Sequence, residues 1–102
     1  MNAEFDTVED ALKAIAAGEM IVVADDDDRE NEGDLIMAAS KATPEAVAFM
    51  IRHTSGILCA PLLEEQAGSL HLDPMVARND APMSTAFTVS IEARRGVTTG
   101  IS

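Results

Sequence analysis

Hydrophobic positions in the first part of the chain follow two different spacings. Apolar side chains recur three and four residues apart between residues 7 and 18, which predicts an amphipathic helix capped by Thr7 and ended by Gly18. Unbroken apolar runs at residues 20–24 and 35–39 instead predict two buried strands. The pattern therefore predicts a helix followed by two strands with a polar loop between them.

A second helix is predicted after Thr43, because this capping residue is followed by Pro44 and by an acid in the first turn. Gly56 is expected to end it. Four apolar residues form its expected buried face: Ala46, Val47, Met50 and Ile51.

The remaining chain predicts shorter elements. Residues 57–60 are apolar and predict a third strand, and residues 63–70 predict a short helix. Residues 71–84 read as an irregular loop. Residues 86–92 alternate between apolar and polar positions and predict a half-buried strand, whose inward residues are Phe87, Val89 and Ile91. The mixture predicts an α+β fold, with helices packed on a mixed sheet.

Composition limits the size and type of this fold. The 102 residues are 47% hydrophobic and 25% charged, which predicts one domain with a packed core. Aromatic residues make up only 3%, so the core is expected to be aliphatic. The net charge of −11 argues against partners such as nucleic acid or an anionic membrane. An anionic small ligand stays compatible, because a bound divalent cation reverses the local charge.

The cysteine content and the N-terminal residues indicate the cellular compartment that is expected for the protein. The single Cys59 excludes an internal disulfide, which fits a reducing cytoplasm. The first residues lack the basic start and apolar stretch of a signal peptide. No apolar run reaches the roughly 20 residues of a membrane span. The closing Gly-Thr segment at residues 96–102 is typical of a lead into further structure, so residues 1–102 are expected to form a single incomplete domain.

The stretch 24–34 concentrates the candidate chemistry. It holds seven of the 18 acidic residues between two apolar runs, with Arg29 inside it and Gly33 permitting a tight backbone. Such carboxylates repel each other and resist dehydration, and a hard cation would offset both costs. An EF-hand is excluded, since its twelfth ligand position would be Ala39. Two or three carboxylates with waters suit Mg²⁺ better, although a solvated charged loop is the plain alternative.

Other candidate residues favour ordinary roles. His53 is expected near a helix end, where a cation suits the dipole, and His71 in a loop. Cys59 is expected to be a small buried hydrophobe. Thr98 and Thr99 could line a phosphate site or form a turn. No zinc spacing, dinucleotide fingerprint or Walker A motif is present in the sequence.

Four segments in order resemble one enzyme family. Residues 25–34 (DDDDRENEGD) are similar to the acidic loop of 3,4-dihydroxy-2-butanone 4-phosphate synthase, and the resemblance continues at residues 52–59, 86–91 and 96–102. It covers the N-terminal half of the family's domain. A small departure is Asp27, where the family often has Glu. The family's second half carries a metal-binding His and a further catalytic Glu, which residues 1–102 do not include.

The resemblance implies an activity and roles for individual residues. It implies a Mg²⁺- or Mn²⁺-dependent lyase that converts ribulose 5-phosphate to 3,4-dihydroxy-2-butanone 4-phosphate and formate. By position, Glu30 is the metal ligand, and Arg29 and Asp34 contact the sugar phosphate together with Glu30. Asp34 and Cys59 are the implied catalytic residues. Asp25 and Thr99 are expected near the substrate.

The resemblance also implies partners. The family acts as a homodimer, and its members often carry a fused GTP cyclohydrolase II domain. The 102-residue chain by itself is expected to be inactive. A non-catalytic acidic module that binds divalent cations is the alternative, and a structural fragment with a disordered acidic loop is a third reading.

Overall fold

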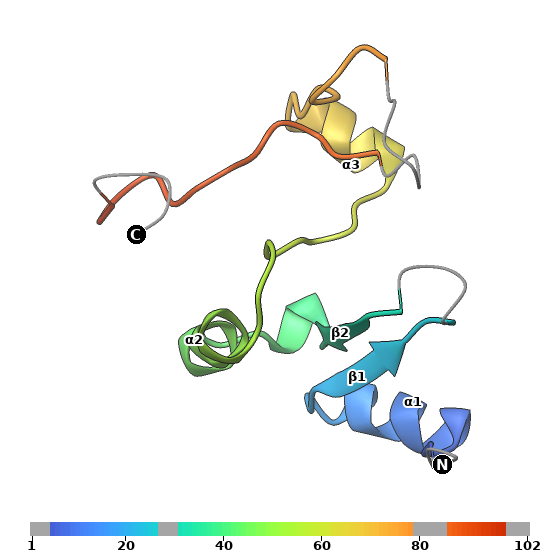
Figure 1. The fold of residues 1–102 in the computed structure, drawn as a ribbon. Helices are drawn as coiled ribbons and strands as arrows, with labels where there is room; N and C mark the ends of the chain where they lie inside the picture. The colour runs from blue at the N-terminus through green and yellow to red at the C-terminus, as the bar shows by residue number, and fades with distance from the viewer. Residues whose placement is uncertain (1–4, 27–30, 79–85, 98–102) are drawn as a thin grey trace. The chain divides into compact units, whose positions relative to one another are not determined.

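The computed structural model describes residues 5–26, 31–78 and 86–97. The chain divides into two compact units, Met1–Ala60 and Pro61–Ser102. The first unit holds the two longer helices and a strand pair, and the second holds one short helix (Figure 1). The elements of the first unit are α1 (Val8–Ala16), β1 (Ile21–Ala24), β2 (Gly33–Ile36), the 3-10 turn η1 (Ala39–Lys41) and α2 (Pro44–His53).

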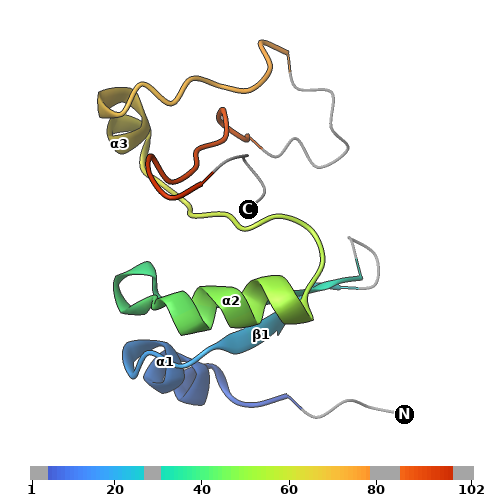
Figure 2. The same cartoon turned by 90° about the vertical axis from the view of Figure 1, so that its left-hand side faces the viewer.

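Helix α1 begins and ends as its sequence predicts. The Oγ1 atom of Thr7 accepts the N–H of Asp10 at 3.1 Å, which satisfies one of the free donors of the first turn. Gly18 follows the helix with φ +85°, and its N–H donates to the carbonyl of Ile15 at 3.1 Å. A residue with a side chain would be strained in that left-handed conformation. The chain reverses there, so that α1 lies along β1 in both views (Figures 1 and 2).

Strands β1 and β2 form one antiparallel pair, with Val22 opposite Leu35 and Val23 opposite Asp34. The strand predicted at residues 20–24 is confirmed as β1, whereas β2 overlaps the strand predicted at residues 35–39 only at Leu35 and Ile36. The predicted burial of both strands is wrong. Val22 is 70% exposed and Val23 is 46% exposed. A two-stranded sheet has two faces and two edges, and apart from its partner β2, strand β1 is covered among the described elements mainly by a small contact with α1. The aliphatic side chains therefore stay accessible.

Helix α2 has the predicted start and an earlier end. Thr43 Oγ1 accepts the N–H of Ala46 at 3.1 Å, and Pro44 occupies the first turn, where its missing N–H costs nothing. The prediction that Gly56 ends the helix is wrong. Thr54 takes extended dihedral angles, and its hydroxyl donates to the carbonyl of Met50 at 2.6 Å. A side chain that bonds the last turn ends the helix before glycine is needed.

The expected inward face of α2 is only partly sheltered. Ala46, Val47 and Met50 have intermediate exposure, as does Met37 in the segment that follows β2. Ile51 is 66% exposed, so its predicted burial is wrong. It follows that α2 shelters a narrower stripe than the apolar spacing predicts.

Replacing Thr43 by Ala tests the cap of α2. Loss of the Oγ1 acceptor is expected to lower the stability of α2 by about 1 kcal/mol. Amide hydrogen exchange of the α2 residues in the 102-residue chain should then accelerate about fivefold, because 1.4 kcal/mol corresponds to tenfold. Thr43→Ser keeps the acceptor and is the matched control. Equal exchange in the Ala and Ser variants would contradict a capping role.

The second unit contains helix α3 (Glu64–Ser69), which confirms the short helix predicted there. The side-chain oxygen of Gln66 accepts the N–H of Leu63 at 3.0 Å at its start. The predicted strand at residues 86–92 is wrong. Only Thr88 takes part in pairing, in an isolated bridge to Pro74. Bonds from Met75 and Val89 flank the bridge, and Ile91 beyond it is 78% exposed.

The strand predicted at residues 57–60 is also wrong, since this segment belongs to no strand. A strand requires a neighbouring ladder, and an apolar run supplies only the tendency to join one. The α+β class is confirmed, and the sheet within the described ranges is the antiparallel β1–β2 pair. None of the described residues is buried, so the described parts of the two units do not form the expected aliphatic core. No helix in the described ranges is long and apolar enough for a membrane crossing.

Candidate functional site

The β1–β2 pair continues one step beyond its last regular pairing. Asp25 follows β1, and its N–H donates to the carbonyl of Glu32 at 3.1 Å. In return, the N–H of Glu32 donates to Oδ1 of Asp25 at 2.9 Å. Asp25 and Glu32 are the next partners in the register that pairs Ala24 with Gly33. A side-chain carboxylate therefore occupies the place that a backbone carbonyl usually takes in such a pair.

The next residues close the base of the acidic loop. The N–H of Asn31 donates to the carbonyl of Asp26 at 3.3 Å, and Asn31 adopts φ +52°. Asparagine tolerates this left-handed conformation better than most residues. The sequence suggested that Gly33 would supply the tight backbone, and this was wrong. Gly33 lies within β2, where an added Cβ would stand 3.2 Å from Cγ1 of Val22, so its small size matters there.

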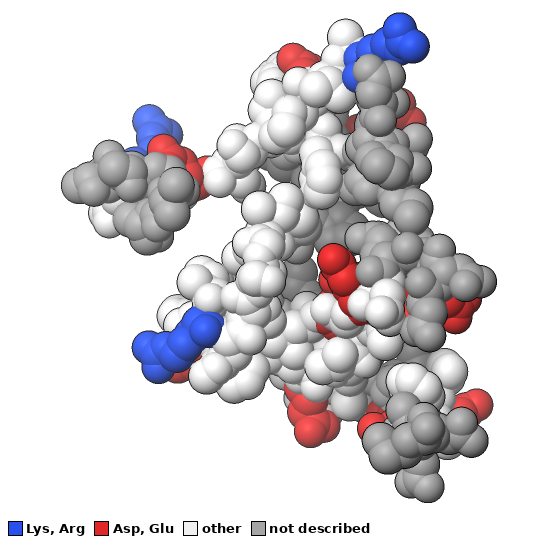
Figure 3. Space-filling model, viewed as in Figure 1, with Lys and Arg blue, Asp and Glu red and all other residues white. Residues whose placement is uncertain are grey.

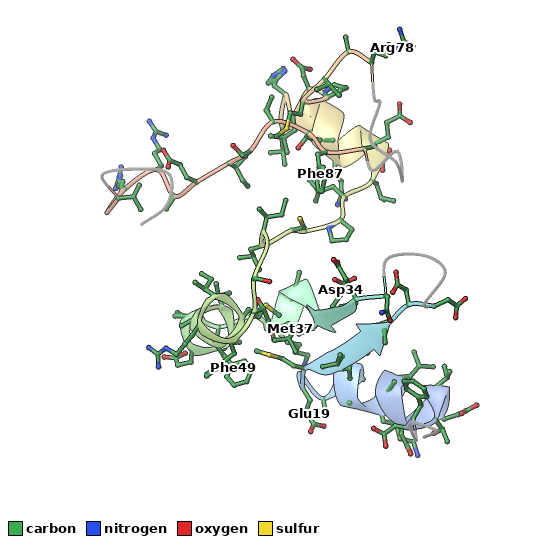
Figure 4. The ribbon with its side chains drawn as sticks, viewed as in Figure 1. Glu19, Asp34, Met37, Phe49, Arg78 and Phe87 are labelled. Carbon is green, nitrogen blue, oxygen red and sulfur yellow. The ribbon has the colours of Figure 1, made fainter. Side chains whose placement is uncertain are left out.

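Asp34 lies on the same face of the strand pair as Asp25. It stands opposite Val23, and side chains two residues apart along a strand share a face. Figure 4 shows its side chain projecting from β2 away from α1. The regular positions that share this face with Asp34 are aliphatic: Ile21, Val23 and Ile36. The fold thus brings two of the predicted substrate residues to one face.

Carboxylates dominate the electrostatics of this region. Asp26, Glu32 and Asp34 are all exposed. The described residues beside the loop, 25–26 and 31–34, hold four carboxylates and no Lys or Arg, and acidic side chains are visible on the face drawn in Figure 3. Such a surface raises the local concentration of cations. The arrangement can therefore attract a metal ion toward the hairpin.

A magnesium ion would find suitable donors here, although the structure does not assemble a full set. Within residues 5–26, 31–78 and 86–97, no three His, Cys, Asp or Glu side chains form a metal-binding group. Mg²⁺ commonly takes only one or two protein carboxylates and keeps several waters. A single carboxylate from the acidic stretch can meet that requirement. The predicted ligand Glu30 lies outside the described residues, as does Arg29.

Cys59 belongs to the same unit as the hairpin but to a different segment. The prediction that it is buried is wrong, because it is exposed. Its Sγ lies 4.0 Å from the carbonyl oxygen of Ile57, and it makes no hydrogen bond to the described hairpin residues. Thr99 lies outside the described residues. Of the predicted site residues, the structure therefore brings together Asp25 and Asp34.

A shallow hollow on α2 is separate from these carboxylates in sequence. Its volume is about 280 Å³, and its lining side chains are Glu45, Ala48, Phe49, Arg52 and His53. The rings of Phe49 and His53 are 4.6 Å apart at an angle of 50°. His53 is the last residue of α2, at the helix end where it was expected. All five side chains come from one helix, so the hollow is a feature of the surface of α2.

Sequence reasoning missed the backbone of Glu32 and the conformation of Asn31. Both help to close the loop base, through the amide that meets Asp25 and through a positive φ. An Asn near the end of a polar loop between two apolar runs is a turn signal that could have indicated the second feature. The first depends on strand register, which no single residue reveals.

Known proteins similar to this chain come from one family. Residues 9–102 match the family model of 3,4-dihydroxy-2-butanone 4-phosphate synthase. The riboflavin biosynthesis protein RibBA of Nocardia farcinica (strain IFM 10152) is 62% identical over 98 residues, covering 96% of this chain and 24% of that protein. RibBA of Rhodococcus erythropolis (strain PR4 / NBRC 100887) is 58% identical over 98 residues, covering 96% and 23%. The chain spans about a quarter of the length of these relatives.

The solved structures that resemble this chain are also 3,4-dihydroxy-2-butanone 4-phosphate synthases. A crystal structure of 3,4-dihydroxy-2-butanone 4-phosphate synthase in complex with two magnesium ions matches with a TM-score of 0.86 and 50% identity, over 96% of this chain and 46% of that chain. A cation-free form of such a synthase matches with a TM-score of 0.77 and 46% identity, over 94% and 43%. Since the family model matches nearly the whole sequence, the chain belongs to the 3,4-dihydroxy-2-butanone 4-phosphate synthase family.

Proposed function

We propose that this chain supplies part of the active site of a lyase of riboflavin biosynthesis. The reaction converts ribulose 5-phosphate to 3,4-dihydroxy-2-butanone 4-phosphate and releases C4 as formate. The observation that carries the proposal is the hairpin, which holds Asp25 and Asp34 on one face beside an acidic loop. Family membership and the names of the relatives support it.

The proposed residue roles follow from the chemistry of a sugar phosphate. The guanidinium of Arg29 is suited to the phosphate, and the hydroxyl of Thr99 can donate to a substrate oxygen. The carboxylate of Asp34 can accept a proton or hydrogen bond from a substrate hydroxyl. Its place among aliphatic neighbours supports this role, because a charge there has little structural purpose. Cys59, whose thiol is exposed, is the second proposed catalytic residue.

Glu30 is the proposed ligand of a divalent cation. Mg²⁺ is the first choice and Mn²⁺ the second, since both prefer carboxylate and water oxygens. The ion would supply Lewis-acid stabilisation of negative charge that develops on the sugar oxygens. The acidic surface around the hairpin supports a cation here, and one solved synthase that resembles this chain is in complex with magnesium.

The remaining proposals concern the whole protein. We place both units in a single domain that acts as a homodimer in the cytoplasm. The greater length of the relatives supports a fused GTP cyclohydrolase II domain in the complete protein. The negative charge of −11 supports a small-molecule substrate over nucleic acid or a membrane surface.

Activity is best tested in a chimera, in which this sequence replaces the matching 98 residues of the Nocardia farcinica relative. The chimera is expected to release formate from ribulose 5-phosphate when Mg²⁺ is present. Asp34→Asn should lower kcat/KM by about a hundredfold, the usual size of an acid–base contribution. Asp10→Asn removes the same charge from α1 and should leave turnover unchanged. Equal rates for both variants would remove Asp34 from the proposed machinery.

Calorimetry on the chimera separates the lyase from a simple cation-binding module. An active site that holds metal and substrate together requires each to strengthen binding of the other by the same factor. We expect Mg²⁺ to bind more tightly when ribulose 5-phosphate is present. An unchanged affinity for Mg²⁺, together with no binding of the sugar phosphate, would favour the module.

A further inference from the structure

We propose that Asp25 is a positioning residue, whose carboxylate holds the base of the acidic loop closed and thereby sets the position of Asp34. This inference rests on the proposed lyase function and adds the physical role of one residue to it. Its basis is the pair of hydrogen bonds that joins Asp25 to Glu32, at 3.1 Å through the backbone and 2.9 Å through the carboxylate.

The two bonds lie where the strand pair would otherwise open. The last regular pairing joins Ala24 to Gly33, and the acidic residues beyond it repel one another. The Asp25–Glu32 bonds extend the β1–β2 pairing by one residue pair. They therefore oppose the repulsion between carboxylates, which would otherwise separate the strand ends. Asp25 is also less exposed than Asp26, its neighbour along the chain.

The carboxylate acts here as an acceptor. Glu32 contributes only its backbone to the pair, so its side-chain charge is not used. Oδ1 of Asp25 is engaged by an N–H of the same hairpin, which places the residue in the structure of the site. An uncharged acceptor of the same shape should therefore serve almost as well. Asparagine is such a residue, whereas alanine has no acceptor at all.

The link from Asp25 to Asp34 is short and passes through β2. Glu32 immediately precedes β2, and Asp34 is the second residue of that strand. When the N–H of Glu32 is released, the end of the β1–β2 pair loses a hydrogen bond two residues from Asp34. Asp34 should then keep its chemistry but spend less time in the productive position. The expected signature is a fall in kcat with a smaller change in KM.

The test compares three variants of the chimera: Asp25→Asn, Asp25→Ala and the control Asp26→Ala. Asp25→Asn should keep kcat within about fivefold of the parent, and Asp25→Ala should lower it at least about thirtyfold. Asp26→Ala removes a neighbouring charge, but the described hydrogen bond of Asp26 uses its main-chain carbonyl, so turnover should change little. Exchange of the Glu32 amide should accelerate about tenfold in Asp25→Ala and stay near the parent rate in the other two.

Each outcome decides between the roles. If Asp25→Asn is as inactive as Asp25→Ala while the Glu32 amide stays protected, the charge itself meets the substrate or metal, and the positioning role is overturned. The role also fails if the amide exchanges freely in Asp25→Ala without loss of kcat. A parent chimera that forms no formate would instead refute the lyase function, while amide exchange would still report on the Asp25–Glu32 bonds. Thermal melting of each variant identifies one that has not folded.

Discussion

Glu30→Gln in the chimera should abolish Mg²⁺-dependent formate release. The substitution keeps the size of the side chain and removes the charge of the proposed metal ligand. Metal ions contribute several kcal/mol of charge stabilisation to such reactions. A loss of about 4 kcal/mol corresponds to about a thousandfold in rate, because each 1.36 kcal/mol is tenfold. The measurement is the rate of formate release across a titration with Mg²⁺.

The neighbouring residue Glu32 provides the control for this result. Glu32→Gln makes the same chemical change within the acidic stretch but keeps the backbone bonds to Asp25. Its Mg²⁺ dependence should be close to that of the parent, and both variants should melt near the parent temperature. Turnover that survives in Glu30→Gln would assign the metal ligand elsewhere. Equal losses in the two variants would point to the total charge of the loop.

The 102-residue chain without the rest of a synthase domain should release no formate from ribulose 5-phosphate. No described residue is buried, although many large apolar side chains are present. Burial of apolar surface contributes about 25 cal/mol per Å² to the free energy of unfolding. Because these side chains are largely accessible, they contribute little of this stabilisation in the 102-residue chain. The solved synthase with magnesium has a chain of which this sequence covers 46%.

Placing this sequence in the chimera should give both cooperative folding and turnover. The purified chain should show a broad thermal transition with little cooperativity, and the chimera a sharp one. Formate release is followed for both proteins at equal concentration with excess Mg²⁺. A sharp transition for the 102-residue chain would mean that a core does form within it. Formate release by that chain would overturn the assignment of the missing residues to the active site.

Local sequence signals predicted the helices well because their causes are local. The caps of α1 and α2 are bonds between residues three apart, Asp10 to Thr7 and Ala46 to Thr43. Proline at the first position of α2 acts through its own ring. The end of α2 was misplaced, because the hydroxyl of Thr54 competes with glycine for the same purpose. The sequence alone does not show which of the two residues, Thr54 or Gly56, ends the helix.

Strands were predicted less well, because an apolar run does not name its partner. Residues 57–60 have strand-like composition and no ladder. Residues 86–92 alternate as a half-buried strand should, yet only Thr88 pairs, in its bridge to Pro74. Hydrogen bonds in a sheet join segments far apart in the chain, so their formation depends on tertiary context.

The family resemblance and the acidic loop were available from the sequence alone. The order of the four segments was sufficient to predict the family, which the match over residues 9–102 confirms. The roles proposed for Arg29, Glu30 and Thr99 still rest on that resemblance, and the described residues do not test them. The roles of Asp34 and Cys59 remain proposals as well, although the structure shows where both residues lie.

What the sequence determined by itself was the set of helices, the acidic stretch and the family, because each depends on residue type and short spacing. Only the tertiary structure decided that Asp25 meets the amide of Glu32, and that it shares a face with Asp34. The reason is register. A shift of one residue in the β1–β2 pairing would turn these side chains to the opposite face, and the residue types alone do not specify that register.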